Sequence, residues 1–565
     1  MKRPALLPLV LPTLSAWVAA GVAAWALGCS GPEKHGQPQT AKAREITLIF
    51  TTELQGTVEP CGCTSDPLGD LARTASLVRK LAGERPTLLL DGGSTLYTEN
   101  PPTALRAREE EEKAGVLAGV LPELGLAAQG LGPYDLVRGV AGVRLPRMAV
   151  NVDAAGGVPL APPRVIEVGG TKLGVFGVVD PALVASFGVT ASDPVAAAQA
   201  AIAQLKKDGA EVVVALAHMP VRGARALAKD APGADVILVG AAVPEKGVTS
   251  PEQVGGSWLV TPGNKGQVLA RLDITVDGAG PLVDAIGPAR AATRRDAIAT
   301  ELTQLDAKLA KWAGDASADK AFVAQKQAER ATLAAEAAAL EKDPLRKPAR
   351  GSFFTFELVA IKKKLACDAG VVAKKTALDR AVGEANRASA ASEPPVPVTP
   401  GAATYVGMEE CSYCHKPAVE QWKTTRHAAA FATLEKVGKE WSRDCIACHV
   451  TGWREPGGAT LAKTEGLRDV QCEVCHGPGS IHVAADGKEK PRSLVRAPLA
   501  ERCANACHTK EHSDTFAYDA YLRDVTGPGH GEKFRKALGD GPTGHELRAA
   551  ALAKAGAEIG AGCSK

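Results

Sequence analysis

A repeated cysteine–histidine motif near the C-terminal end constrains this chain more than any other feature. Three copies of Cys-x-x-Cys-His begin at Cys411, Cys445 and Cys472, and a fourth copy, which begins at Cys503, has one extra residue between its cysteines. The chain has 13 Cys and 11 His, and nine of each lie after Tyr405. The C-terminal region therefore has a chemistry that the rest of the chain does not share.

This motif is typical of covalent haem attachment. The two cysteines of a copy form thioethers to the two vinyl groups of a haem, and the adjacent histidine binds the iron. Zinc sites and disulfides are the alternatives, but neither requires a histidine directly after the second cysteine in every copy. We therefore predict four haem c groups. The predicted thioether cysteines are Cys411, Cys414, Cys445, Cys448, Cys472, Cys475, Cys503 and Cys507, and the predicted proximal iron ligands are His415, His449, His476 and His508.

Five other histidines of this region could bind the opposite face of an iron. A second imidazole gives a six-coordinate, low-spin iron suited to passing electrons. A missing one leaves an open position where a small molecule can bind. These candidate distal histidines are His427, His482, His512, His530 and His545.

Longer stretches around the motifs carry a family resemblance. They are Tyr405–His415, Trp422–Phe431, Val470–His482, Cys507–Phe516 and Gly529–Gly531. Over about residues 404–540 the chain resembles the cytochrome c-554-type tetrahaem proteins. The resemblance implies a mainly helical fold that wraps closely packed haems.

The same resemblance implies roles for single histidines. It makes His427, His482 and His530 distal iron ligands. It also points to the haem of Cys445, Cys448 and His449 as the one with an open position. His512 is expected on the surface or beside a ligand, and His545 lies beyond the match, where an ordinary structural role is favoured.

The N-terminus has the pattern of an export signal. An apolar stretch from Ala5 to Leu27 follows two basic residues and ends in Leu27-Gly28-Cys29. We predict a signal peptide with a lipobox over residues 1–28, lipidation at Cys29 and a tether over 29–44, with an uncleaved anchor helix as the alternative. The expected location is the periplasmic side of the cell envelope, with the membrane reached through the lipid anchor. Ser30, directly after the lipidated cysteine, favours the outer membrane.

The rest of the chain divides by composition. Residues 45–288 alternate short Val-, Ile- and Leu-rich runs with stretches of helical period, which predicts an α/β domain. Residues 289–390 are expected to form a helical segment with one added strand, residues 391–403 a proline-rich linker, and residues 404–565 the cytochrome domain. We thus expect a multidomain chain: an α/β sheet sandwich with flanking helices, a helical segment and a mainly α multihaem cytochrome c domain. The net charge of +3 excludes a nucleic-acid partner.

Five short motifs of the α/β region follow one another in a family order. They are Thr52–Gly56, Asp91–Ser94, Gly132–Asp135, Ala217-His218 and Gly240–Val243. They resemble the 5′-nucleotidase branch of the calcineurin-like metallophosphoesterases. That family binds two metal ions, which orient and activate water against a phosphate ester.

The ligands of that family are mostly replaced here. Glu53 and His218 are the residues that could still bind metal. Because hard or borderline cations need several anionic or imidazole ligands, we expect no dinuclear metal site and no phosphatase activity. The residues that stand where the family has metal ligands or its general acid are Gln55, Ser94, Pro133, Tyr134, Ala241 and Val243.

The remaining cysteines allow several interpretations. Cys61 and Cys63 follow the first of these motifs, where they could form a redox-active pair, bind a soft metal or form a structural disulfide. Cys367 and Cys563 could pair with each other, but the sequence does not decide this.

These observations favour an electron carrier over an enzyme. The expected function is electron transfer at the cell envelope, with other envelope redox proteins as partners. A haem-based oxidoreductase acting on a small nitrogen or sulfur compound at an open haem is the alternative. Phosphoester hydrolysis is disfavoured because the metal ligands are missing.

Overall fold

The computed structural model describes residues 43–60, 64–99, 103–137, 144–153, 158–314, 319–488, 493–510, 512–556 and 562–563. All residues from Ala43 onward belong to one compact unit. The expected signal peptide with Cys29, most of the tether, and the pair Cys61 and Cys63 lie outside the described residues. Within the described ranges, none of the helices combines the length and the apolar character that crossing a bilayer requires.

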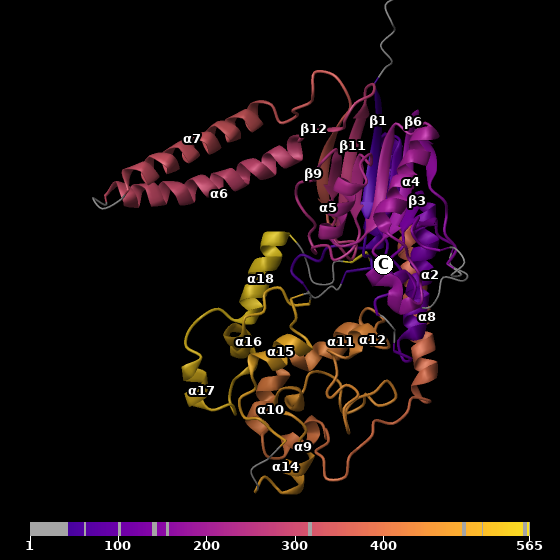
Figure 1. Ribbon diagram of the computed structural model, residues 1–565. Coiled ribbons are helices and arrows are strands. Elements are labelled where there is room, and N and C mark those ends of the chain that lie inside the picture. The colour runs from indigo at the N-terminus through magenta and orange to yellow at the C-terminus, as the bar shows by residue number, and fades with distance from the viewer. Residues whose placement is uncertain are drawn as a thin grey trace, which may run out of the picture. The chain divides into compact units, whose positions relative to one another are not determined.

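Two β-sheets form the N-terminal domain (Figure 1). The first sheet has the strand order β12-β13-β11-β1-β2-β3-β4, and the second has the order β5-β6-β7-β8-β10-β9. The strands of the first sheet are β1 (Arg44–Thr51), β2 (Thr87–Asp91), β3 (Leu126–Gly130), β4 (Arg147–Met148), β11 (Val268–Val276), β12 (Val283–Asp284) and β13 (Phe353–Ala360). Those of the second are β5 (Arg164–Val168), β6 (Thr171–Val179), β7 (Val212–His218), β8 (Val236–Val239), β9 (Glu252–Val254) and β10 (Ser257–Val260).

Helices cover the outer faces of both sheets, as the sequence predicts for a sandwich. Ile46, Leu48 and Phe50 of β1 join the core that also contains Val175 and Val214 of the second sheet. Ile49, which lies between Leu48 and Phe50 in β1, joins the core under the helices, because successive side chains of a strand point to opposite faces of the sheet. The covering helices are α1 (Leu71–Glu84), α2 (Ala107–Glu123) and α8 (Ala369–Ala390) on the first sheet and α4 (Pro194–Lys207) and α5 (Val221–Asp230) on the second.

The sheet extends beyond residue 288, where the sequence placed the end of the α/β domain. β13 pairs with β11 from Thr275↔Phe353 to Val268↔Ala360, so it completes the first sheet instead of joining a separate helical segment. Helix α8 likewise packs on this sheet through Val371, Leu378 and Val382. A strand that is distant in sequence can pair with any open edge of a sheet, and amino-acid composition does not indicate which edge and register it adopts.

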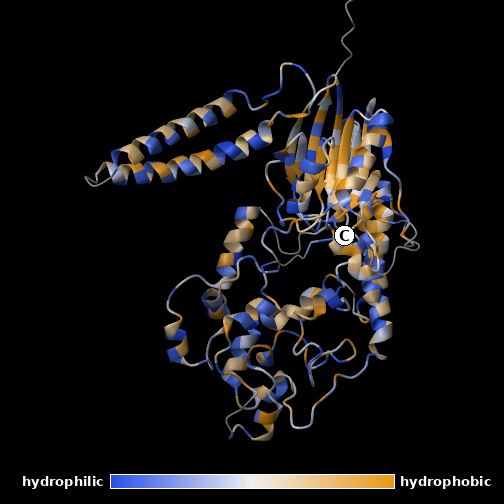
Figure 2. Ribbon diagram, in the orientation of Figure 1, coloured by the Kyte–Doolittle hydropathy of each residue, from blue (hydrophilic) through white to orange (hydrophobic). Residues whose placement is uncertain are grey.

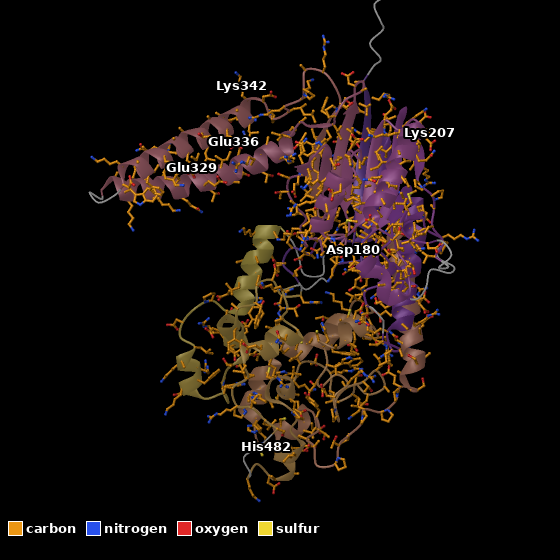
Figure 3. All side chains as sticks on the ribbon, viewed as in Figure 1. Asp180, Lys207, Glu329, Glu336, Lys342 and His482 are labelled. Atoms are coloured by element: carbon orange, nitrogen blue, oxygen red, sulfur yellow. A yellow bond between two sulfur atoms is a disulfide. The ribbon has the colours of Figure 1, made fainter. Side chains whose placement is uncertain are left out.

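An antiparallel helical hairpin is inserted between β12 and β13 (Figure 1). It consists of α6 (Pro288–Ala313) and α7 (Lys320–Lys342), as the helical period predicts. Arg294 of α6 binds Glu336 of α7 at 2.8 Å, with Glu336 labelled in Figure 3. The buried residues of the hairpin include Ala291, Ile298 and Leu340, which form one apolar cluster.

Short helices and loops make up the C-terminal region, which fits the mainly helical fold that the resemblance implies. Its apolar core is small and includes Phe431, Leu434 and Ile446. Figure 2 shows apolar residues gathered in the two sheets and scattered in this region. A region with so small a core needs another source of stability, such as a bound group. The helices are α9 (Met408–Ser412), α10 (Lys416–Lys423), α11 (Ala430–Glu435), α12 (Arg443–Ile446), α13 (Cys472–His476), α14 (Ser480–Ala484), α15 (Ala500–Ala506), α16 (Tyr518–Val525), α17 (Glu532–Ala537) and α18 (Gly544–Ala555).

A disulfide joins Cys367 and Cys563, the pairing that the sequence left open. The two cysteines are 196 residues apart in the chain. Cys367 lies just before α8, so the bond ties the C-terminal end of the chain to the N-terminal domain. A cross-link over so long a loop restricts the unfolded chain strongly.

Candidate functional site

The four cysteine–histidine motifs lie at short helices of the C-terminal region. Cys411 is in α9, Cys445 in α12, Cys472 in α13 and Cys503 in α15. None of the eight cysteines of the motifs, all of which the structure describes, is in a disulfide. The disulfide alternative is therefore not realised, and these thiols remain available for thioether bonds.

Two pairs of histidine rings have the spacing of axial ligands to one metal ion. The ring centroids of His415 and His482 are 6.2 Å apart, and those of His427 and His508 are 6.3 Å apart. Two imidazoles that each bind a shared ion at about 2 Å place their centroids about 6 Å apart. His482, on α14, is labelled in Figure 3. Both pairs combine a motif histidine with one of the candidate distal histidines.

The third motif has a candidate distal histidine beside it. Burial lowers the pKa of His530, and the ring of His476 lowers it further. The Nδ1 atom of His476 donates to the carbonyl of Val495 at 2.8 Å, which leaves its Nε2 as the ligating nitrogen. The Nδ1 atom of His530 accepts from the backbone N–H of Gly527 at 3.3 Å, so the neutral ring carries its hydrogen on Nε2 and must exchange tautomers to bind iron through that atom.

His449 of the second motif is held in the same manner but has no such neighbour. Its Nδ1 donates to the carbonyl of Ala430 at 2.6 Å, which leaves Nε2 as the ligating nitrogen. Metal-ligating histidines commonly donate their second N–H to a carbonyl, which fixes the ring. Among the described residues, no histidine ring pairs with His449 as His482 pairs with His415.

The donor set of the four motifs therefore suits haem c. Each motif offers two cysteine thiols next to a histidine, and the Nδ1 atoms of His449, His476 and His508 are engaged by neighbouring groups. His512 belongs to neither of the two histidine pairs, and its Nδ1 is hydrogen-bonded to the Thr509 hydroxyl at 2.8 Å. His545 lies on α18, where its backbone N–H donates to Asp524.

Contacts between motifs define an order in space that differs from the order in sequence. The carboxylate of Glu473, inside the third motif, accepts at 2.8 Å from the backbone N–H directly before α9, which carries the first motif. The side chain of Arg502 in α15 donates to the carbonyl of Val474 at 2.6 Å, so the third motif neighbours the fourth. The Cys448 thiol donates to the carbonyl of Ala506 at 3.7 Å, which joins the fourth motif to the second. The motifs thus follow one another as first, third, fourth and second.

The metallophosphoesterase-like motifs lie at strand ends of the two sheets, where His218 is enclosed by hydrogen bonds. This histidine is 1% exposed, and its Nδ1 lies 2.8 Å from the carbonyl of Gly92. Because a carbonyl only accepts, Nδ1 carries the hydrogen and Nε2 accepts from the Ser94 hydroxyl at 3.1 Å. Burial lowers the pKa of His218, which keeps the ring neutral. No pattern in the sequence predicts this Ser94–His218 bond, which spans both sheets.

Two carboxylates near this histidine are engaged by the backbone. Asp135 accepts from the N–H groups of Ser94 and Thr95, both at 2.8 Å. Glu53 accepts from the N–H groups of Val243 at 3.1 Å and Ala242 at 3.3 Å. Within the described residues, no group of three or more His, Cys, Asp and Glu side chains could hold a metal ion. The acidic residues of this region thus serve the loops that surround them.

Asp91, at the end of β2, provides a pH test of this arrangement. It is fully buried, and burial raises its pKa from 3.8 to about 6. The unfolded chain therefore loses this proton at a lower pH than the folded chain, so stability falls as pH rises from about 4 to about 6. We expect the charged Asp91 carboxylate to lower the free energy of unfolding by about 2 to 3 kcal/mol at pH 7 but not at pH 4, and Asp91→Asn to remove this loss. Chemical denaturation of the wild type and the variant at each pH measures their difference in stability. A difference that is the same at both pH values would contradict the prediction.

Comparison with known proteins finds relatives of the C-terminal region first. Residues 410–477 match the family model described as cytochrome c554 and c-prime. This segment is therefore similar to the cytochromes of the c554 class, and the α/β sheet sandwich is similar in fold to the 5′-nucleotidases and calcineurin-like phosphoesterases.

Particular relatives cover parts of the chain. A cytochrome c-554 of Nitrosomonas europaea is 38% identical in an alignment of 137 residues, and the match covers 19% of this chain and 58% of that protein. The structure of its reduced state has 26% identity and a TM-score of 0.20, and the match covers 24% of this chain and 95% of that one. A 5′-nucleotidase precursor from Thermus thermophilus has 23% identity and a TM-score of 0.35 over 42% of this chain and 52% of that one.

Proposed function

We propose that this chain binds four haem c groups and transfers electrons at the cell envelope. The observation that carries the proposal is the spacing of the two histidine pairs, 6.2 Å for His415 with His482 and 6.3 Å for His427 with His508. Packing alone does not require two histidine pairs at this distance, each of which includes a histidine of a haem motif. When bound, each haem supplies a one-electron iron couple.

The assignment of ligands follows from the same contacts. His415 and His482 serve the first motif, His476 and His530 the third, and His508 and His427 the fourth. His449 serves the second motif from one side. Three irons are thus six-coordinate and suited to electron transfer, and the contact order makes the first and second motifs the two ends of the array.

The location rests on the N-terminal pattern and on the disulfide. Residues 1–28 have the features of a lipoprotein signal, with Cys29 as the lipidated residue. The disulfide between Cys367 and Cys563 fits an oxidising compartment outside the cytoplasm. The partners are accordingly other redox proteins of the envelope.

A second function is favoured by one observation at the second motif. His449 has no histidine counterpart among the described residues, so the iron held there has a position for a small ligand. An oxidoreductase acting on a small nitrogen or sulfur compound would use that position.

Spectroscopy of the haem-loaded, full-length protein tests these proposals. We expect a mass that corresponds to four haems, three low-spin ferric signals and one high-spin signal in paramagnetic resonance. Nitric oxide or hydroxylamine should alter only the high-spin signal. Fewer than four haems would overturn the attachment sites. Four low-spin irons that bind neither nitric oxide nor hydroxylamine would exclude the oxidoreductase function and leave electron transfer as the proposed function.

A further inference from the structure

A carboxylate of the second haem motif is held by the N-terminal domain. Asp444 directly precedes Cys445, the first cysteine of that motif. Its two oxygens accept hydrogen bonds from the guanidinium of Arg106 and the ammonium of Lys113. Lys113 lies on α2, Arg106 directly precedes that helix, and the side chain of Lys113 is 13% exposed. The side chains of Arg106 and Asp444 are 25% and 32% exposed, so this ion pair is partly withdrawn from water.

A second carboxylate extends the contact along the same helix. Glu109 is 2% exposed, and it accepts from the hydroxyl of Ser442 at 3.0 Å and from the N–H of Arg443 at 3.3 Å. Asn386 of α8 donates to the same carboxylate at 3.4 Å and to the carbonyl of Trp441 at 2.9 Å. The segment that leads into α12 is thus fixed to α2 and α8.

The spacing of these residues makes one docking face. Arg106, Glu109 and Lys113 are three and four residues apart, so they lie on one side of the helix. Buried charges cost more than apolar contacts of equal size unless they have paired partners. Apolar residues could join the two domains at least as well, so stability alone does not explain why charged residues form this contact.

The charges of this cluster reach the attachment site itself. Asp444 is bonded in sequence to Cys445, and Glu109 accepts from Ser442 and Arg443, which precede that cysteine by three and two residues. A group bound at Cys445 would therefore lie close to these charges and experience their field.

We propose that Arg106, Glu109 and Lys113 are positioning residues that dock the second haem segment against the N-terminal domain and set the reduction equilibrium of the haem bound there. The inference rests on the proposed attachment of haem at Cys445 and Cys448. It gives the α/β domain a use that does not involve hydrolysis, as a built-in partner of one end of the haem array.

Two substitutions with opposite charge effects test the inference. Lys113→Met removes a positive charge and should favour the ferric state, which lowers the equilibrium constant for reduction about tenfold, or about 59 mV for one electron. Asp444→Asn removes a negative charge and should raise the constant by a similar factor. The double variant should return close to the wild-type value. A redox titration that follows the high-spin signal measures the second haem, and the three low-spin haems of the same molecule serve as internal references.

Further variants separate a specific role from a general loss of structure. Lys113→Arg keeps the charge and should keep the wild-type potential. Arg294→Met removes an ion pair of the α6–α7 hairpin and should leave all four potentials unchanged. Wild-type protein without haem at Cys445 would overturn the proposed attachment. Four haems whose potentials do not move, or move in the same direction in both single variants, would overturn the docking role alone.

Discussion

Replacing His427 by alanine is expected to convert one low-spin iron of the haem-loaded protein into a high-spin iron. The ring of His427 lies 6.3 Å from that of His508, so it supplies the sixth ligand for the fourth motif in our assignment. Without it, the iron held by His508 has an open position. Paramagnetic resonance should then show two high-spin and two low-spin irons, and nitric oxide should bind to two sites.

The chain contains two matched controls for this experiment. His512 is hydrogen-bonded to Thr509, and His545 lies on α18, so alanine at either position should leave all four signals unchanged. A His427→Ala variant that keeps three low-spin irons would show that the observed pairing does not persist with haem bound. A loss of the first rather than the fourth low-spin signal would show that His427 serves His415, its neighbour in sequence.

Replacing Asp70 by asparagine is expected to destabilise the protein by about 3 to 4 kcal/mol. The Asp70 carboxylate accepts from the N–H of Ala72 at the start of α1, from the ammonium of Lys375 at 2.6 Å and from the N–H of Cys563 at 2.8 Å. The side chains of Asp70 and Lys375 are 0% and 4% exposed. Burial lowers the pKa of Lys375, and Asp70 opposes this effect. Asparagine would leave this buried ammonium with Glu59, at 3.4 Å, as its remaining ion-pair partner among the described residues.

Guanidinium denaturation followed by circular dichroism measures this loss of stability. In the double variant Asp70→Asn/Lys375→Met no buried charge remains unpaired, so at least half of the lost stability should return. The exposed pair of Arg225 and Glu252 provides a control, because Glu252→Gln should cost less than about 1 kcal/mol. An Asp70→Asn variant as stable as this control would show that the Asp70–Lys375 pair contributes little.

The parts of the fold that could be predicted from the sequence depend on neighbouring residues. The period of two in β1 and the helical period of α6 and α7 both reflect which side of one element is buried. The position of β13 could not be predicted, because its partner β11 is distant in sequence. The pairing of Cys367 with Cys563 and the cluster around Asp444 depend on the same kind of distant contact.

The same division applies to the candidate site. The sequence by itself determined the predicted haem cysteines and proximal histidines, because thioether attachment needs both within a few consecutive residues. Only the tertiary structure decided that His427 lies opposite His508 rather than His415, and that the second motif adjoins the fourth. An axial pair needs two rings on opposite sides of one iron, and packing alone brings distant segments to such positions. The charges that α2 presents to Asp444 were also decided by packing, because no local pattern joins residues so far apart in the chain.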